Sequence, residues 1–127
     1  MGKFAVKEVK TGIMFNLKSG NGQVIATSEI YKSKASCMNG IESVRANCAA
    51  EIEDQTVENF AKLKNPKYEV YADKKGQFRF RLKAKNGQII ATSEGYKTLA
   101  SAKKGIASVK KNSVDAPVDD LTEKPEA

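Results

Sequence analysis

Histidine and tryptophan are absent from this 127-residue chain, and proline (3 residues) and cysteine (2 residues) are scarce. Because histidine is the commonest general base and a frequent zinc ligand, its absence excludes the usual catalytic triads and most zinc sites. No run of 18 apolar residues is present, so the sequence predicts no membrane-spanning helix. The first residues lack the apolar run of a signal peptide, and we therefore expect a cytoplasmic protein.

The two cysteines, Cys37 and Cys48, lie in a stretch whose apolar residues have helical spacing. Eleven residues of helix would place them on one face but about 16 Å apart along the axis, which is too far for a disulfide bond. They share that face with Ile41 and Val44. Both cysteines are therefore expected to behave as small, buried apolar side chains.

Positive charge is what the chain has in excess, with 22 Lys and Arg against 15 Asp and Glu and a net charge of +7. The net charge is +2 over residues 1–65, +9 over residues 66–114 and −4 over residues 115–127. A basic half beside an acidic end is compatible with nucleic-acid binding through counterion release. A solvated surface that keeps a small protein in solution is the favoured interpretation, since no RNA-binding or helix-turn-helix motif accompanies the charge.

An internal repeat is the most informative pattern in the sequence. Residues 15–47 recur at 80–112 with a constant offset of 65 and 20 identities over 33 positions. Upstream, residues 4–6 match 68–70 at an offset of 64, so the second copy has one extra residue near Gly76. A unit of about 50 residues buries too little surface to be stable alone. We therefore expect the two copies to share one core.

Alternating apolar residues predict three strands in each copy. The predicted ranges are 4–9, 13–19 and 23–29 in the first copy and 68–72, 77–84 and 88–94 in the second. Asn21–Gly22 and Asn86–Gly87 predict two-residue type I′ turns between the second and third strands. The register set by such turns puts Ile25 and Ile90 on the outer face of the sheet, opposite the buried face.

An amphipathic helix is predicted after the third strand of each copy, from an N-cap at Ser33 or Thr98 to about Asn47 or Asn112. Asparagine at these ends predicts a left-handed C-terminal cap. The apolar stripes are Cys37, Ile41, Val44 and Cys48 in the first copy and Ala102, Ile106, Val109 and Ser113 in the second. A neighbouring stripe of small residues recurs in both copies, at positions 36, 40, 43 and 47 and at 101, 105, 108 and 112. It predicts a close approach to each helix, either by the other helix or by the returning chain.

The motifs NGQ[VI]IATSE, YKS or YKT and GI-x-SV, in this order in both copies, resemble the YegP-like family of uncharacterised bacterial proteins. The resemblance covers about residues 3–56 and 67–122. It implies an α+β fold in which two tandem β-β-β-α-β repeats form one antiparallel sheet with both helices on one face. It also implies that the C-terminal strands, near Ile52 and Val118, are swapped between the halves. The family has no assigned biochemical activity.

The repeat and the resemblance together predict the organisation of the chain. Repeat 1 is expected over residues 1–56, a connector over 57–66, repeat 2 over 67–122 and a disordered acidic tail over 123–127. The two repeats are expected to form one structural domain and, because each satisfies the other, a monomer.

A catalytic site is not predicted. Glu29 and Ser28, which recur in the second copy, are neighbours along a strand and therefore point to opposite faces. Two separated glutamates do not make a carboxylate cage for a metal ion. The turn at residues 20–22 lacks the Lys-Ser/Thr pair and the helix of a phosphate-binding loop. The protein is thus predicted to be non-catalytic, without a metal or cofactor.

A binding site is a more substantial hypothesis. Arg79, Arg81 and Lys83 alternate along one strand and so project from one sheet face, with Lys85 at the turn and Tyr71 on the adjacent strand. Basic side chains around an aromatic ring are typical of a platform for single-stranded nucleic acid or another polyanion. One ring stacks few bases, however, and the first copy has fewer cations on this face. A structural or protein-interaction module is the favoured function, and nucleic-acid binding through this face is the alternative.

Overall fold

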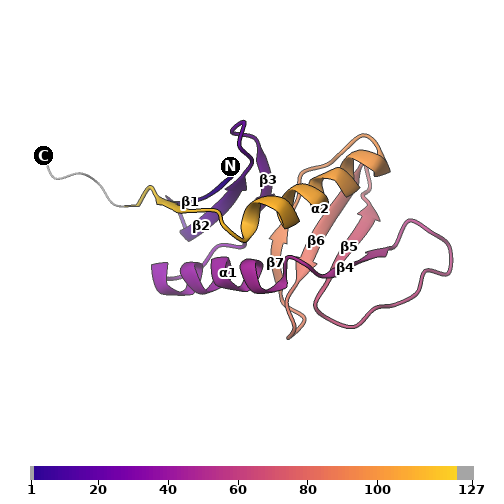
Figure 1. The fold of residues 1–127 in the computed structure, drawn as a ribbon, viewed down its shortest axis with the longest axis horizontal. Helices are drawn as coiled ribbons and strands as arrows, with labels where there is room; N and C mark the ends of the chain where they lie inside the picture. Colours follow the sequence, from indigo (N-terminus) through magenta and orange to yellow (C-terminus); the bar gives the residue numbers. More distant parts are fainter. Residues whose placement is uncertain (1, 123–127) are drawn as a thin grey trace, which may run out of the picture.

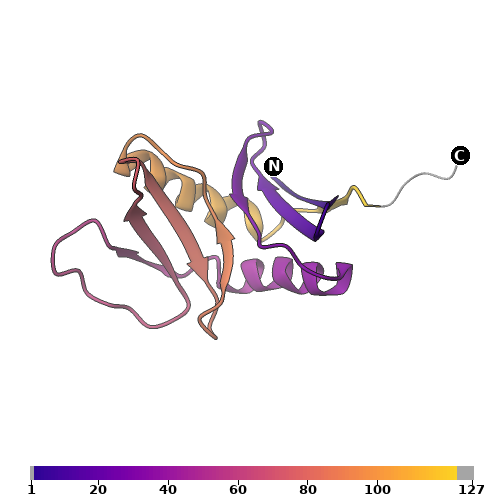
Figure 2. The ribbon, with the colours of Figure 1, turned by 180° about the vertical axis from the view of Figure 1, so that it is seen from behind.

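The computed structural model describes residues 2–122 and shows one sheet with both helices on the same face (Figure 1). Figure 2, from behind, shows the strands in front of the helices. The first copy forms β1 (Lys3–Val9), β2 (Gly12–Lys18), β3 (Val24–Thr27), α1 (Lys34–Asn47) and β4 (Glu51–Asp54). The second copy forms β5 (Lys67–Ala72), β6 (Phe78–Lys83), β7 (Ile89–Thr92), α2 (Leu99–Ser113) and β8 (Val118–Asp120). The predicted acidic tail, 123–127, lies outside the described residues.

The strand order in the sheet is β4-β5-β6-β7-β3-β2-β1-β8. The two halves meet where β3 pairs with β7 through Thr27 and Thr92. Strand β4 of the first copy pairs with β5 of the second, and β8 of the second copy pairs with β1 of the first, which confirms the swapped C-terminal strands.

The swapped strands pair in parallel, so the sheet is mixed rather than antiparallel throughout. The expectation of an antiparallel sheet comes from the family resemblance and from the hairpins, which join only antiparallel neighbours. Strands β4 and β8 are reached through a helix instead, and such a connection allows a parallel entry.

The turns between the second and third strands are longer than predicted. Gly22 N–H donates to the Ser19 carbonyl (2.9 Å), and Ser19 N–H donates to the Gln23 carbonyl (2.9 Å). Among the turn residues only Gly22 has a left-handed φ, of 86°, and Gly87 repeats it at 85°. These features define a three-residue loop that ends in a glycine bulge, so the predicted type I′ turn is wrong. Asparagine followed by glycine suits both loops, and for this reason the dipeptide alone did not separate them.

A bulge in each hairpin changes which residues of the third strand are buried. Between Leu17 and Lys18 the register shifts, because Leu17 pairs with Ala26 while Lys18 pairs with Val24. Ile25 is therefore the extra residue of the bulge and turns toward the core, where it is only 7% exposed. Its counterpart in the second copy behaves in the same way, and the predicted outer-face position of both isoleucines, 25 and 90, is wrong.

The predicted helix N-caps are confirmed, because the Ser33 and Thr98 hydroxyls each accept a hydrogen bond from the backbone N–H three residues on (3.1 and 3.0 Å). The predicted left-handed C-caps are wrong. The residue after each helix has a right-handed φ, of −64° and −61°. The side-chain amide of Asn47 instead donates to the Ser43 carbonyl (2.7 Å), and Asn112 makes the equivalent bond (2.8 Å). Each asparagine side chain thus turns back to the residue one turn earlier in its own helix instead of capping the helix end.

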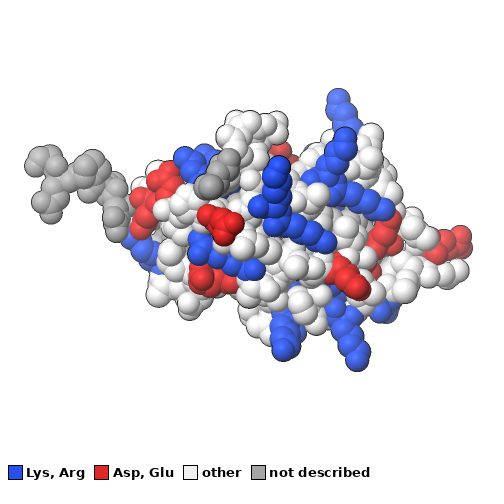
Figure 3. All heavy atoms as spheres, in the orientation of Figure 1, with Lys and Arg blue, Asp and Glu red and all other residues white. Residues whose placement is uncertain are grey.

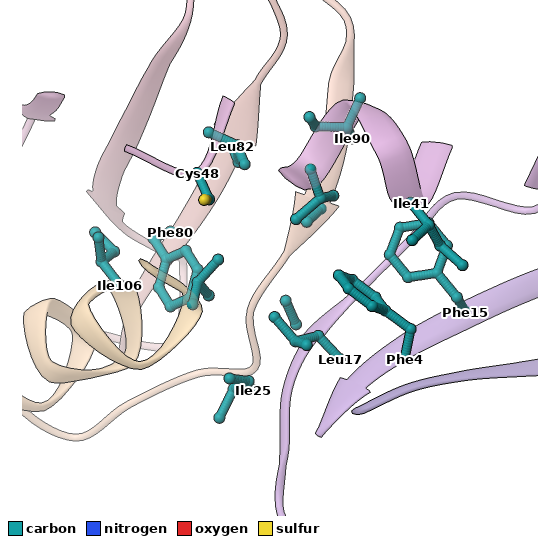
Figure 4. Packing of buried hydrophobic residues seen from close by; sticks show 14 of the residues in the cluster. Phe4, Phe15, Leu17, Ile25, Ile41, Cys48, Phe80, Leu82, Ile90 and Ile106 are labelled. Atoms are coloured by element: carbon teal, nitrogen blue, oxygen red, sulfur yellow. The ribbon is translucent and has the colours of Figure 1, made fainter. Parts of the chain in front are cut away.

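Both predicted apolar stripes are buried in one cluster that draws on both copies. Figure 4 shows Phe4, Phe15 and Ile41 of the first copy on one side and Phe80 and Ile106 of the second on the other. Helix α1 contacts β6 and β7 of the other half, and α2 contacts β2 and β3. The helices thus cross the junction between the halves and join them through a shared core.

The close neighbour predicted for the small-residue stripes is a tyrosine of the same copy. A Cβ atom at Gly40 would overlap the Tyr31 hydroxyl, and one at Gly105 would lie 2.6 Å from the Tyr96 hydroxyl. These distances leave no room for a side chain, so the ring explains why glycine is needed at both positions.

Candidate functional site

The predicted polyanion-binding residues do come together on the outer face of the second half. Tyr71 of β5 pairs with Arg79 of β6, and the guanidinium of Arg81 lies 4.7 Å from the centroid of the Tyr71 ring. Lys83 ends the same strand, and Lys85 is exposed in the β6–β7 turn. Strand parity therefore places Tyr71, Arg79, Arg81 and Lys83 on one face, as predicted.

Carboxylates that sequence reasoning missed lie among these cations. Arg81 Nε donates to Glu69 (2.5 Å), and Lys83 Nζ lies 3.3 Å from the same carboxylate. Arg79 Nε donates to Asp73 (2.8 Å). A signal for Glu69 was available, because Glu69 has the same strand parity as Tyr71. Each cation predicted on β6 thus has an acidic partner in its own chain.

A buried ionic cluster underlies this face and consists of Glu53, Lys67, Glu69, Arg81 and Lys83. Lys67 Nζ lies 2.8 Å from Glu53 and 3.3 Å from Glu69. Glu53 is only 2% exposed and Glu69 only 3%. Glu53 belongs to the swapped strand β4, so the cluster joins the two copies.

The cluster also fixes the connector that follows β4. The Leu63 N–H and the Gln55 side-chain amide each donate to Glu53 (both 2.7 Å). Burial acts to raise the pKa of Glu53, but hydrogen bonds from Lys67, Gln55 and Leu63 outweigh burial and lower that pKa to about 2. Glu53 is therefore ionised at neutral pH and holds the connector against the sheet.

The first half has a simpler outer face. Lys3 and Asp119 form the equivalent of the Lys67–Glu53 pair, at 3.2 Å, but their side chains are 46% and 43% exposed. Ala5 and Asn16 occupy the positions that Glu69 and Arg81 have in the second half. The swapped strand can therefore be held without a buried cluster.

A groove lies on the other side of the molecule, between α2 and the β2–β3 turn, and we call it the α2 groove. Its volume is about 640 Å³, and its lining includes Gly2, Ser19, Asn21, Lys104, Ser108 and Lys111. A related cavity of about 250 Å³, the α1 groove, lies between α1 and the β6–β7 turn. The pseudo-symmetry of the repeat relates the two grooves, and each joins the helix of one copy to a hairpin of the other.

The hydroxyl and thiol groups weighed for catalysis are engaged or buried. The Ser28 hydroxyl accepts from the Phe15 N–H (2.9 Å) and donates to the Glu29 carbonyl (2.7 Å). Burial raises the pKa of the Cys37 thiol, and Cys48 is also buried.

Within residues 2–122 no group of three or more His, Cys, Asp or Glu side chains is placed to hold a metal ion. Neither helix in this range has the length and apolar character needed to cross a membrane.

Comparisons with known proteins agree with the repeat. The family model described as "Domain of unknown function (DUF1508)" matches residues 10–54 and again 73–120. The UPF0339 protein YegP of Yersinia pestis is 42% identical over 123 residues, which cover 96% of this chain and 97% of the relative. The chain belongs to the YegP-like UPF0339 family.

Two solved structures of this family share the fold. The solution NMR structure of YegP from E. coli, described as a protein of unknown function, has a TM-score of 0.78 and 39% identity, and it covers 98% of this chain and 96% of that one. A UPF0339 protein of Shewanella oneidensis has a TM-score of 0.77 and 36% identity, with 95% and 92% coverage. These descriptions assign no activity to the UPF0339 family.

Proposed function

We propose that this UPF0339 protein is a non-catalytic interaction module whose ligand is another protein. The observation that carries the proposal is the pairing of the cations on β6. Arg79 is paired with Asp73, and Arg81 and Lys83 are paired with Glu69. A phosphate that bound these cations would have to displace a carboxylate, and for Glu69 this would remove part of the compensation of a buried charge.

The α2 groove offers a surface without this competition, because two lysines beside it have no acidic partner in the described part of the chain. Lys104 and Lys111 border this groove, and both are exposed. The fold itself forms the groove, and a helix and a hairpin from different copies form its walls over one shared core. A preformed groove limits the ordering cost of binding.

Photo-cross-linking with the full-length chain tests the proposal. A photoreactive residue replaces exposed alanines on three surfaces, Ala107 on α2, Ala46 on α1 and Ala72 at the end of β5. In an extract of the organism that makes the protein, we expect at least one position to yield a protein adduct that excess unlabelled chain competes away. If none of the three positions yields a competed protein adduct, the proposal is wrong.

Single-stranded nucleic acid, bound through Tyr71, Arg79, Arg81, Lys83 and Lys85, is the second candidate. A small excess of positive charge favours it, because the four cations and Lys67 outnumber the carboxylates of Glu53, Glu69 and Asp73. The exposed position of Lys85 also favours it. A fluorescence titration with a thymidine oligonucleotide at low and moderate salt tests it. Binding should weaken steeply with salt, and replacing Lys85 and Arg79 by alanine should reduce that dependence. No binding at low salt would exclude this candidate.

A further inference from the structure

We infer that the α2 groove is the docking site for an acidic, extended segment of the partner protein, and that Lys104 and Lys111 bind its carboxylates. The inference rests on the proposed protein-binding function and adds a place and a ligand chemistry to it. Figure 3 shows Lys and Arg side chains gathered over α2 on the face that the helices occupy.

The lysines of α2 divide into two pairs. Lys103 forms an ion pair with Asp54 at 3.2 Å, and Lys110 lies over an aromatic ring, 5.6 Å from its centroid. Lys104 and Lys111, which line the groove, have no ion-pair or hydrogen-bond partner among residues 2–122. Of the lysines on α2, the two that face the groove are therefore the ones without a partner in this range.

The spacing of these lysines suits an extended chain. Lys104 and Lys111 are seven residues apart, which is about 10.5 Å along a helix. An extended peptide advances about 3.3 Å per residue, so the two ammonium groups span about three of its residues. Ala107 and Ser108 lie between them along the groove and keep it open, because neither has a long side chain.

The α1 groove provides an internal comparison. With the offset of 65, Asn39 and Ala46 stand where α2 has Lys104 and Lys111. Ser43 corresponds to Ser108, so the small-residue stripe recurs without the positive charge. The fold thus does not need lysine at these helix positions, and the charge on the α2 groove needs another explanation.

The chemistry of the groove favours a peptide over a nucleic acid. Its lining contains no aromatic ring on which a base could stack. It also includes Asp115, whose carboxylate can accept a hydrogen bond from a peptide N–H, a donor that a phosphate backbone lacks. Ser19 and Asn21 on the facing hairpin add further hydrogen-bonding groups.

Fluorescence anisotropy with the full-length protein tests the inference. The probe is a labelled peptide of about ten residues in which Glu recurs at every third position among Ser residues, and the control peptide has Gln in place of Glu. At about 20 mM salt, where exposed charges are weakly screened, the acidic peptide should bind and the control should not. Lys104→Asn with Lys111→Ala, the residues found in α1, should weaken binding about tenfold.

Two further variants separate the groove from charge in general. Lys74→Asn with Lys75→Ala removes the same charge from the exposed β5–β6 turn and should leave binding unchanged. Asp115→Asn should tighten binding about twofold, since it removes the negative charge from the lining. All variants are first compared with the parent chain by thermal unfolding, which should be unchanged because the replaced side chains are exposed.

The inference is wrong if the acidic peptide does not bind at about 20 mM salt, or if the groove and turn variants weaken binding equally. It is also wrong if a thymidine oligonucleotide binds more tightly than the peptide and loses that affinity in the groove variant. In these cases competed cross-links from Ala46 or Ala72 would still support a protein partner. Absence of every competed cross-link would instead overturn the proposed function itself.

Discussion

The two halves of this protein hold their swapped strands with the same ion pair in different surroundings. Lys3–Asp119 lies at 3.2 Å in water, whereas the Lys67 and Glu53 side chains, 2.8 Å apart, are 11% and 1% exposed. In the buried pair, the Glu53 carboxylate also accepts a hydrogen bond from the backbone N–H of Leu63 and so holds the connector. The connector joins the first copy to the second, and within residues 2–122 the first half has no equivalent segment to hold. The comparison shows that the buried cluster serves the connector rather than strand exchange as such.

Exposure also decides how much each pair matters to stability. An exposed pair contributes about 0–1 kcal/mol, because solvent screens it and its side chains lose entropy. Removing one partner of a buried pair costs about 3–5 kcal/mol, since the remaining charge is left without compensation. Removing one partner of the ion pair should therefore reduce stability more in the second half than in the first.

Removing the buried cation should have the largest effect. Lys67→Met leaves Glu53 and Glu69 short of a partner and should lower the free energy of unfolding by about 3–5 kcal/mol. The matched change in the first half, Lys3→Met, should cost less than about 1 kcal/mol. Urea unfolding of both variants measures the difference, and equal losses would contradict the comparison.

Introducing the buried acid into the first half should have the next largest effect. Ala5 is 1% exposed. Lys3 and Lys18 stand where Glu69 has its lysine partners, but Asn16 replaces the arginine, so Ala5→Glu should cost about 2–3 kcal/mol. Adding Asn16→Arg, at the paired position on β2, should recover about 1 kcal/mol. A double-mutant cycle measures the coupling, and no recovery would show that the pair needs the rest of the cluster.

The acid dependence of stability should reflect Glu53. Its pKa is about 2 in the folded protein, below the ordinary value of 4.5, so its stabilisation is complete above about pH 4.5 and is lost as the pH falls toward 2. The loss between pH 7 and pH 3 should be about 2 kcal/mol from this group. Glu53→Gln should be less stable at pH 7 and lose less on acidification. Parallel curves for variant and parent would contradict this assignment.

The smallest effect is expected at Tyr71, whose ring lies against Arg81 in the second half and whose equivalent in the first half is Lys7. Tyr71→Leu keeps apolar cover over the cluster but removes the cation–π contact, so it should cost about 0.5–1 kcal/mol. Thermal unfolding measures the change. A loss as large as that of Lys67→Met would mean that the ring, rather than the ion pairs, stabilises this face.

Features that depend on local periodicity could be predicted from the sequence. The strands, the N-caps at Ser33 and Thr98 and both apolar helix stripes follow from spacing within a few residues. Ile25 could not be placed, because a single bulge residue reverses strand parity and the Asn-Gly pair does not specify the loop length.

The candidate site was predicted only in part for a different reason. The positions of Arg79, Arg81 and Tyr71 follow from parity within two neighbouring strands. The two arginines are neutralised by Asp73 and Glu69, which counting cations alone overlooks. The cluster beneath them also includes Glu53, which strand exchange brings from the other copy. Likewise, the α2 groove lies between a helix and a hairpin of different copies, so no local pattern indicates it.

The swapped edge strand also has a mechanical consequence. β1 and β8 run in parallel, with bonds from Phe4 N–H to the Pro117 carbonyl and from Leu121 N–H to the Val6 carbonyl. Opposed forces applied at Lys3 and Leu121 would slide one strand along the other and load these bonds together, in shear, rather than open them one after another. A tether attached at these two points would thus meet its main resistance at the edge of the sheet, before the force reached the helices.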